Sequence, residues 1–197
     1  MADLSTSDRP GTRERILDTT AELFRRYGYT GTGLKQIVAL ANAPFGSIYH
    51  FFPGGKEQLG AEVIHRSGRM YEELLTAIVD AAPDLESGLR DCFLGAAAVL
   101  VETDYADACP IETVALEVAS ANETLRLATA EVFASWIRAA VARFTGSGVP
   151  AEHAEDLALS VVALLEGAFV LARAAKDVQP LRAAGEAAVA LLERARA

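Results

Sequence analysis

The chain has 197 residues, of which 51% are hydrophobic and 23% charged, so it is too apolar for a disordered chain and long enough to bury a sizeable core. Two cysteines are too few for a disulfide scaffold, and the longest uncharged apolar runs are shorter than the roughly 18 residues of a membrane span. No apolar signal segment opens the chain. The composition therefore predicts a globular, cytoplasmic protein.

The net charge of −9 is unevenly distributed along the chain. Residues 1–66 hold eight basic and seven acidic residues, a net charge of +1, whereas residues 67–197 hold ten basic and twenty acidic residues, a net charge of −10. A nearly neutral segment can approach phosphate, while an acidic one is repelled by it. We therefore expect two parts with different partners, a head at residues 1–55 and a body at residues 56–197.

The head pattern predicts three helices after a loose arm at residues 1–11. The first begins near Thr12, its expected cap, and stops at Gly28. A short second helix has its apolar face at Leu34, Ile37, Val38 and Ala41, and Pro44 suits the first position of the third.

In the third helix the predicted inward stripe is Ile48, Phe51 and Phe52, which leaves Gly46, Ser47, Tyr49 and His50 outward. Two short helices joined in this way form the helix-turn-helix arrangement that places a recognition helix in the major groove of DNA. Spacing alone is also compatible with a purely structural helix pair.

The body is rich in Ala and Leu and shows helical periodicity without strand alternation, which predicts an all-α protein. Helix-breaking proline, glycine and asparagine residues divide the body sequence into about six predicted helices. The predicted ranges are Lys56–Ala81, Asp84–Thr103, Ile111–Ala121, Glu123–Phe144, Ala151–Lys176 and Gln179–Ala195.

The residue types sharpen this interpretation. The stretches Gly31-Thr32-Gly33-Leu34-Lys35-Gln36-Ile37 and Gly46-Ser47-Ile48-Tyr49-His50-Phe51-Phe52-Pro53-Gly54-Gly55-Lys56 resemble the TetR family of bacterial transcriptional repressors. The Pro-Gly-Gly-Lys variant and the segment Cys109-Pro110-Ile111-Glu112-Thr113-Val114-Ala115-Leu116-Glu117 are similar to the sub-branch of lincomycin- and flavonoid-responsive repressors. The resemblance implies a homodimer, an operator in double-stranded DNA and a small-molecule effector, with no cofactor.

The resemblance and the outward face together predict the DNA contacts. Ser47 and His50 can reach base edges or phosphates, and Tyr49 and Lys56 resemble phosphate-contacting positions of the family. Gly46 either lets the helix approach DNA closely or packs tightly against the second helix. Thr32, Lys35, Arg9 and Arg13 are weaker candidates for backbone or groove contacts. Phe45 replaces a frequent basic residue, and either extends the core near Phe52 or touches a thymine methyl group.

In the body, the resemblance implies an effector cavity among the helices between residues 66 and 144. The candidate lining residues are Met70, Phe93, Cys109, Leu116, Glu117, Phe133, Trp136, Ile137, Glu166 and Phe169, although such positions also suit an ordinary core.

Glu166 and Arg173 interrupt an apolar helix two turns apart and are expected to pair with neighbouring helices or an interface, or to line the cavity. The helices 151–176 and 179–195 are apolar over a wide arc, as expected if they pack against a second copy in a four-helix bundle. No catalytic, phosphate-cradling or metal-ligand motif is present in the sequence, so we predict neither an enzyme nor a metal site.

Overall fold

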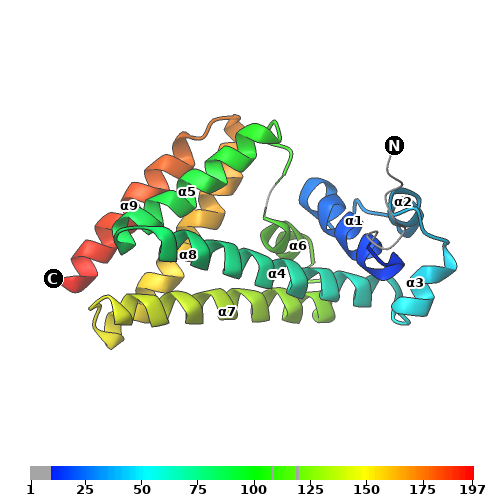
Figure 1. Cartoon of the computed structure of the whole chain (residues 1–197), viewed down its shortest axis with the longest axis horizontal. Coiled ribbons are helices and arrows are strands. Elements are labelled where there is room, and N and C mark those ends of the chain that lie inside the picture. Colours follow the sequence, from blue (N-terminus) through cyan, green and yellow to red (C-terminus); the bar gives the residue numbers. More distant parts are fainter. Residues whose placement is uncertain (1–9, 108, 119) are drawn as a thin grey trace, which may run out of the picture.

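The structure of the chain is a computed structural model that describes residues 10–107, 109–118 and 120–197. In these residues it is built from helices, with no strand (Figure 1). The helices are α1 (Thr12–Tyr27), α2 (Leu34–Leu40), α3 (Gly46–Phe51), α4 (Gly55–Ala81), α5 (Leu85–Glu102), α6 (Pro110–Val118), α7 (Glu123–Gly146), α8 (Ala151–Ala175) and α9 (Gln179–Arg196). The predicted all-α fold is confirmed, with three helices in the head and six in the described body.

The observed helix ends lie close to the predicted ones, with two corrections in the head. Gly11, and not Thr12, occupies the cap position of α1. The helix α3 begins at Gly46 rather than Pro44, because tighter bonds from Ser47 N to Pro44 O and from Ile48 N to Phe45 O close its first turn.

The 27-residue helix α4 runs from the head into the body, alongside α7 (Figure 1). The two helices approach closely at Gly68, where an added Cβ would lie 2.5 Å from a methyl carbon of Val132. The indole Nε1 of Trp136 on α7 donates to the Gly68 carbonyl oxygen at 2.9 Å. This contact fixes the register between α4 and α7 where the body begins.

The head core is filled by fully buried apolar side chains from α1 to α4, with α6 and α7 packed against it. Phe24, Ile37, Ile48, Phe52 and Leu59 each have no exposed surface. Two smaller apolar clusters stabilise the other end of the molecule, where α5, α8 and α9 meet. The helices α2 and α3 therefore pack on a fully buried core that continues into the body through α4, α6 and α7.

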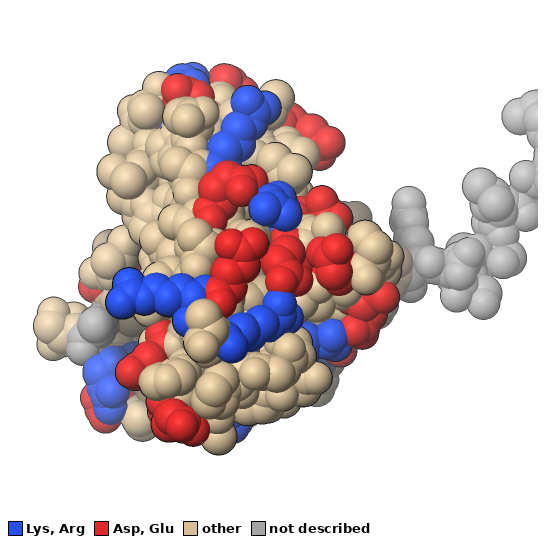
Figure 2. Space-filling model, turned by 90° about the vertical axis from the view of Figure 1, so that its left-hand side faces the viewer, with Lys and Arg blue, Asp and Glu red and all other residues tan. Residues whose placement is uncertain are grey.

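The surface at the end remote from the head carries both charge signs side by side (Figure 2). Its ion pairs include Arg143 with Asp80, Arg90 with Glu186 and Arg196 with Glu86. This mixed surface gives no continuous positive face for the phosphate backbone, which agrees with a body that does not contact DNA.

The helix α8 is apolar enough, with a mean hydropathy of 1.9 over an 18-residue window, to cross a membrane by length and composition. The sequence prediction considered only uncharged runs and did not anticipate this. A core helix of a globular protein meets the same criterion, but only 28% of this window is buried in the single chain. Ala154, Ala158, Ala168 and Ala172 are among the buried residues of α8, whereas Leu159, Val170 and Leu171 are exposed.

Candidate functional site

The outer face of α3 presents the side chains that the sequence pattern predicted. Tyr49 is 54% exposed and His50 is exposed, while Ile48 and Phe52 point into the core. The inward stripe anchors α3 on α1 and α4, so the outward side chains have a fixed direction. Such a rigid, exposed helix face is what reading of a major groove requires.

Phe45 does not extend the core beside Phe52, because 45% of its surface is exposed. It precedes the first full turn of α3 and lies edge-on to Tyr49, with the two ring centroids 6.2 Å apart. The two rings form one aromatic projection at the start of α3, where a thymine methyl group is a suitable partner.

Gly46 is exposed, and an added Cβ there would meet no atom within 4 Å. Tight packing against α2 is therefore not its role, and close approach of a ligand is the remaining interpretation. Ser47 is half-buried next to it, and Lys35 on α2 is exposed.

Two predicted DNA contacts have partners within the protein. Thr32 is buried, and its hydroxyl donates to the Gly28 carbonyl oxygen at 2.7 Å, so it stabilises the turn after α1 and cannot reach DNA from this position. The Lys56 ammonium donates to the Tyr29 carbonyl oxygen at 2.6 Å and lies 4.2 Å from the Tyr29 ring centroid. Burial lowers the pKa of Lys56, opposed by the charge of Glu117. Its remaining N–H groups are still free to meet a phosphate.

The arginines of the head hold the fold together, a role that sequence reasoning missed. Arg15 donates to the carbonyl oxygens of Ala41 and Asn42 at 3.0 and 3.2 Å, which pins the turn between α2 and α3. Arg13 pairs with Glu62 and lies 5.4 Å from the Phe52 ring centroid. Arg9 lies outside the described residues. No motif would have marked Arg15, because its acceptors are backbone carbonyls.

A second candidate site is a cavity of about 260 Å³ inside the body. It lies between α4, α5, α7 and α8, next to a smaller cavity of about 110 Å³. The two share the wall residues Leu75, Cys92, Trp136 and Leu165. An apolar cavity with a few polar groups is the usual form of a small-molecule site.

Half of the predicted cavity residues lie in these walls. Cys109, Trp136, Glu166 and Phe169 line the larger cavity, and Phe93 and Trp136 line the smaller one. Sequence reasoning missed Tyr71, Leu75 and Ile78 of α4, whose helical spacing was visible but is identical to that of core residues.

The other predicted cavity residues lie elsewhere. Leu116 is 75% exposed, and Met70 is exposed in a polar groove between α1 and α4. Phe133 packs edge-on against Trp136 on the side of the head core, and Ile137 packs in the cluster around Phe144. Met70, Phe133 and Ile137 belong to helices that border the cavity but occupy other faces of them, whereas Leu116 lies on α6, which contributes no wall residue.

Glu117 is also absent from the cavity, because its carboxylate reaches the head. The Glu117 Oε2 atom accepts a hydrogen bond from the Thr30 backbone N–H at 2.7 Å, in the turn between α1 and α2. A residue expected to bind an effector thus links α6 of the body to the head.

Glu166 is a polar group in the wall of the larger cavity. Glu166 is 9% exposed, and its Oε2 atom has no hydrogen-bond partner among the described residues. Burial and the nearby charge of Glu112 raise the pKa of Glu166 to about 8, opposed by a hydrogen bond with the Cys109 thiol. Burial raises the pKa of Glu112 to about 7, opposed by the charge of Arg173. Burial also raises the pKa of Cys109, so its thiol stays protonated.

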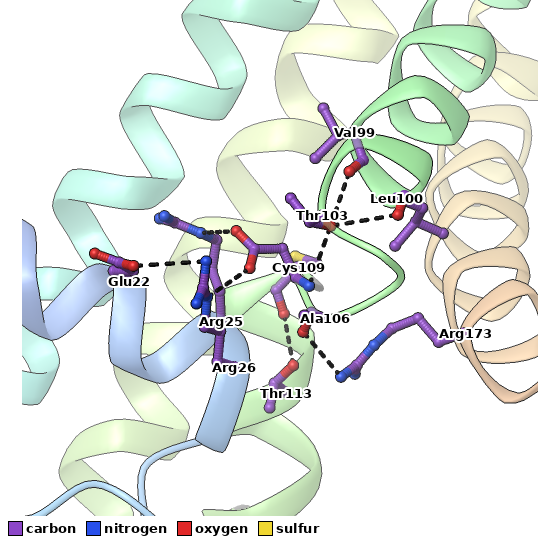
Figure 3. A network of polar contacts seen from close by, with 11 residues as sticks. Glu22, Arg25, Arg26, Val99, Leu100, Thr103, Ala106, Cys109, Thr113 and Arg173 are labelled. Atoms are coloured by element: carbon purple, nitrogen blue, oxygen red, sulfur yellow. Dashed lines mark hydrogen bonds and ion pairs between the residues drawn. The ribbon is translucent and has the colours of Figure 1, made fainter. Parts of the chain in front are cut away.

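Arg173 does not pair with Glu166, and instead holds the loop before α6. Its guanidinium donates to the carbonyl oxygens of Tyr105 and Ala106, each at 3.3 Å. On the other side of this loop, Arg25 and Arg26 of α1 donate to the Asp107 carboxylate at 2.9 and 3.2 Å. Figure 3 shows the loop held between α1 of the head and α8 of the body. Asp107 is itself a cavity wall residue, so cavity, loop and head are directly connected.

No group of three or more His, Cys, Asp or Glu side chains in the described ranges is arranged to hold a metal ion.

Comparison with known proteins finds two family matches along the chain. Residues 16–63 match the family described as bacterial regulatory proteins, tetR family, and residues 86–187 match the family described as transcriptional regulator LmrA/YxaF-like, C-terminal domain. The HTH-type transcriptional regulator YxaF of Bacillus subtilis is 34% identical over 175 residues, covering 89% of this chain and 92% of that protein. The regulator LmrA of the same organism is 31% identical, covering 86% and 90%. The regulatory protein TetR from Rhodobacter sphaeroides shares the fold, with a TM-score of 0.81 at 20% identity over 91% of this chain and 98% of its own.

Proposed function

The chain belongs to the TetR family of bacterial regulators, with a C-terminal domain of LmrA/YxaF-like type, and from this premise we propose that it is a ligand-released transcriptional repressor. It is a DNA-binding transcriptional regulator and not an enzyme. In the proposed mechanism a cytoplasmic homodimer binds a palindromic operator and leaves it when a small, largely apolar compound occupies the body. The observation that carries the proposal is the exposed face of α3 in the head, together with an apolar cavity in the body. The helix α4 joins the two, because it begins directly after α3 and contributes residues to the cavity wall.

In the proposed complex α3 enters the major groove. Ser47 and His50 are the candidates for base edges, Tyr49 and Lys56 for phosphates, and Phe45 for a thymine methyl group. The exposed Lys35 adds a further phosphate contact. Thr32 is left out of this set because it is buried.

The proposed dimer interface is formed by α8 and α9. Leu159, Val170 and Leu171 on α8 and Leu191 on α9 are all exposed in one chain. A groove between the two helices is lined mainly by Ala and Leu residues: Ser160, Ala163, Leu164, Ala187, Ala190, Leu191 and Arg194. A second copy on this surface would bury these apolar groups in a four-helix bundle, and a two-fold axis would give two recognition helices with equivalent half-sites.

Release requires that the effector prefer the dimer whose heads are spaced wrongly for DNA, because a ligand of equal affinity for both states shifts nothing. Three features support coupling of cavity to head: the continuous helix α4, the Asp107 contacts with Arg25 and Arg26, and the Glu117 contact with Thr30. Couplings of this kind amount to about 1–3 kcal/mol, or about 5- to 150-fold in DNA affinity.

Selection from random duplex DNA, followed by footprinting, tests the proposal. The purified protein should enrich a two-fold symmetric site, His50→Ala should weaken or alter that enrichment, and His153→Ala on the exposed start of α8 should not. Enrichment of no sequence at moderate salt would refute sequence-specific DNA binding.

A second candidate function is a helical sensor or interaction protein whose head does not read DNA. The observation that favours it is the internal pairing of the head arginines, which leaves few free cations for phosphate. A small-molecule ligand without any enriched DNA site would support this alternative.

A further inference from the structure

The larger cavity combines an apolar wall with a carboxyl oxygen that lacks a hydrogen-bond partner among the described residues. Tyr71, Leu75, Ile78, Trp136 and Phe169 contribute apolar or aromatic surface to it. Glu166 belongs to the same wall, and its Oε2 atom is buried without a hydrogen-bond donor among the described residues. A buried polar group without a partner is costly, so a bound molecule that supplies a donor would gain from this position.

No basic side chain near Glu166 is available to pair with its carboxyl group among the described residues. Glu112 of α6 is close enough to influence its ionisation, and Arg173 is the basic group that influences Glu112. The N–H groups of Arg173 are engaged by two backbone carbonyls, and Arg25 and Arg26 are engaged by Asp107. The Glu166 carboxyl group therefore faces the cavity, while these nearby guanidinium groups are already engaged by other acceptors.

We propose that the cavity takes a lipophilic amine, whose protonated nitrogen pairs with the Glu166 carboxylate while its apolar part fills the space between α4, α5, α7 and α8. This inference rests on the proposed function only in treating the cavity as the effector site. An amine fits better than an anion, which an ionised Glu166 carboxylate would repel. It also fits better than a hydrocarbon, which would leave Glu166 unpaired.

The titratable groups in the cavity wall besides Glu166 are Tyr71 on α4, Cys92 on α5, and Asp107 and Cys109 before α6. Behind them, the charge of Glu112 on α6 acts on Glu166, that of Arg173 on α8 acts on Glu112, and that of Arg25 on α1 acts on Tyr71. The expected pH dependence of amine binding follows from the Glu166 pKa of about 8. At neutral pH most of the free protein holds the proton, so binding of an ammonium group releases it. The affinity for an amine should therefore increase with pH until Glu166 is ionised without ligand.

The test is calorimetric titration of the full-length protein with 4-phenylbutylamine and with 4-phenylbutan-1-ol, its neutral counterpart of similar length. The amine should bind more tightly than the alcohol, and its affinity should rise between about pH 6.5 and about pH 8, by at most about tenfold per pH unit for one linked proton. Titrations in buffers of different ionisation enthalpy should show proton release with the amine and none with the alcohol.

Glu166→Gln keeps the shape of the side chain and removes its charge. It should weaken the amine by about 10- to 100-fold and abolish its pH dependence and proton release, with little change for the alcohol. Glu102→Gln, on the exposed end of α5, is the matched control and should change neither ligand. Circular dichroism and the melting temperature report whether the Glu166→Gln protein is folded, and the alcohol titration reports whether its cavity is intact.

Equal affinity for amine and alcohol, unchanged amine binding in Glu166→Gln, or binding of neither compound would overturn the proposal. The titrations contain no DNA, so these outcomes leave the repressor function standing. Conversely, failure of the DNA selection would remove the repressor function and leave amine binding to be judged by calorimetry alone.

Discussion

The head and the body of this molecule are both built from packed helices, but the head core is fully packed and the body is not. The head core is filled, and its turns are secured by Arg15, Thr32 and Lys56. The body keeps two cavities, a carboxyl oxygen without a hydrogen-bond partner among the described residues and an uncovered apolar face on α8 and α9. The difference teaches that a reading surface needs rigidity, whereas a sensing and assembling part leaves apolar surface and polar groups for its partners.

The largest difference should appear when an aromatic ring is removed from each part. Phe52→Ala in the filled head core should lower the free energy of unfolding by about 3–5 kcal/mol, because it leaves a new void. Phe169→Ala, at the edge of an existing cavity and half-buried, should cost only about 1–1.5 kcal/mol. Urea unfolding at one fixed protein concentration measures both, and equal losses would contradict the contrast between the two parts.

A smaller effect should follow from the buried Glu166 carboxyl group of the body. The pKa of Glu166 is about 8 in the folded chain against an ordinary value of 4.5, so its contribution to stability is complete below about pH 4.5 and is lost as the pH rises through about 8. In this window the free energy of unfolding should fall by up to about 1.4 kcal/mol per pH unit for this group.

Glu166→Gln cannot ionise and should flatten that slope, which urea titrations at about pH 6 and about pH 8 would measure. Glu102→Gln serves as the exposed control and should keep the slope of the parent chain. An unchanged slope in Glu166→Gln would place the proton on another group, with Glu112, whose pKa is about 7, the first to examine.

The head should separate residues that read DNA from residues that position it. Ser47→Ala or His50→Ala should change the preference among operator variants by about 1–3 kcal/mol if either side chain contacts a base edge. Lys56→Ala should weaken all operators about equally and reduce the slope of log affinity against log salt by about one. Binding isotherms at several salt concentrations distinguish the two patterns, and equal losses on every operator would reassign Ser47 and His50 to the backbone.

The smallest expected effect concerns the exposed link from α6 to the head. Glu117→Gln keeps an acceptor for the Thr30 N–H but loses the charge, and should cost about 0.5 kcal/mol or less of stability. In the proposed mechanism the effector lowers the operator affinity by a certain ratio, which corresponds to a coupling free energy. If the Glu117 link transmits the effector signal, the same variant should reduce this coupling free energy by more than it reduces the free energy of unfolding. A loss of coupling free energy no larger than the loss of stability would make Glu117 only a structural contact.

The local pattern of apolar, capping and breaking residues determined the helices and the direction of the α3 face. These features are decided within one or two helical turns, so Ile48 and Phe52 could be placed inward and Tyr49 and His50 outward from spacing alone. The family followed from short motifs in the same stretch. Helix ends shifted by a residue or two where i→i+3 bonds replaced regular turns, as at Pro44 and Gly46.

Only the tertiary structure decided which partners the polar groups found and where the space in the body lies. Glu117 carries a carboxylate that suits a ligand, yet it accepts a hydrogen bond from the Thr30 backbone N–H, which lies 87 residues away in the chain. Likewise, Phe133 and Trp136 share one helix, but only Trp136 borders a cavity. Helical periodicity fixes which face a residue occupies, whereas a void or an unpartnered carboxyl group depends on how several helices from distant parts of the chain meet.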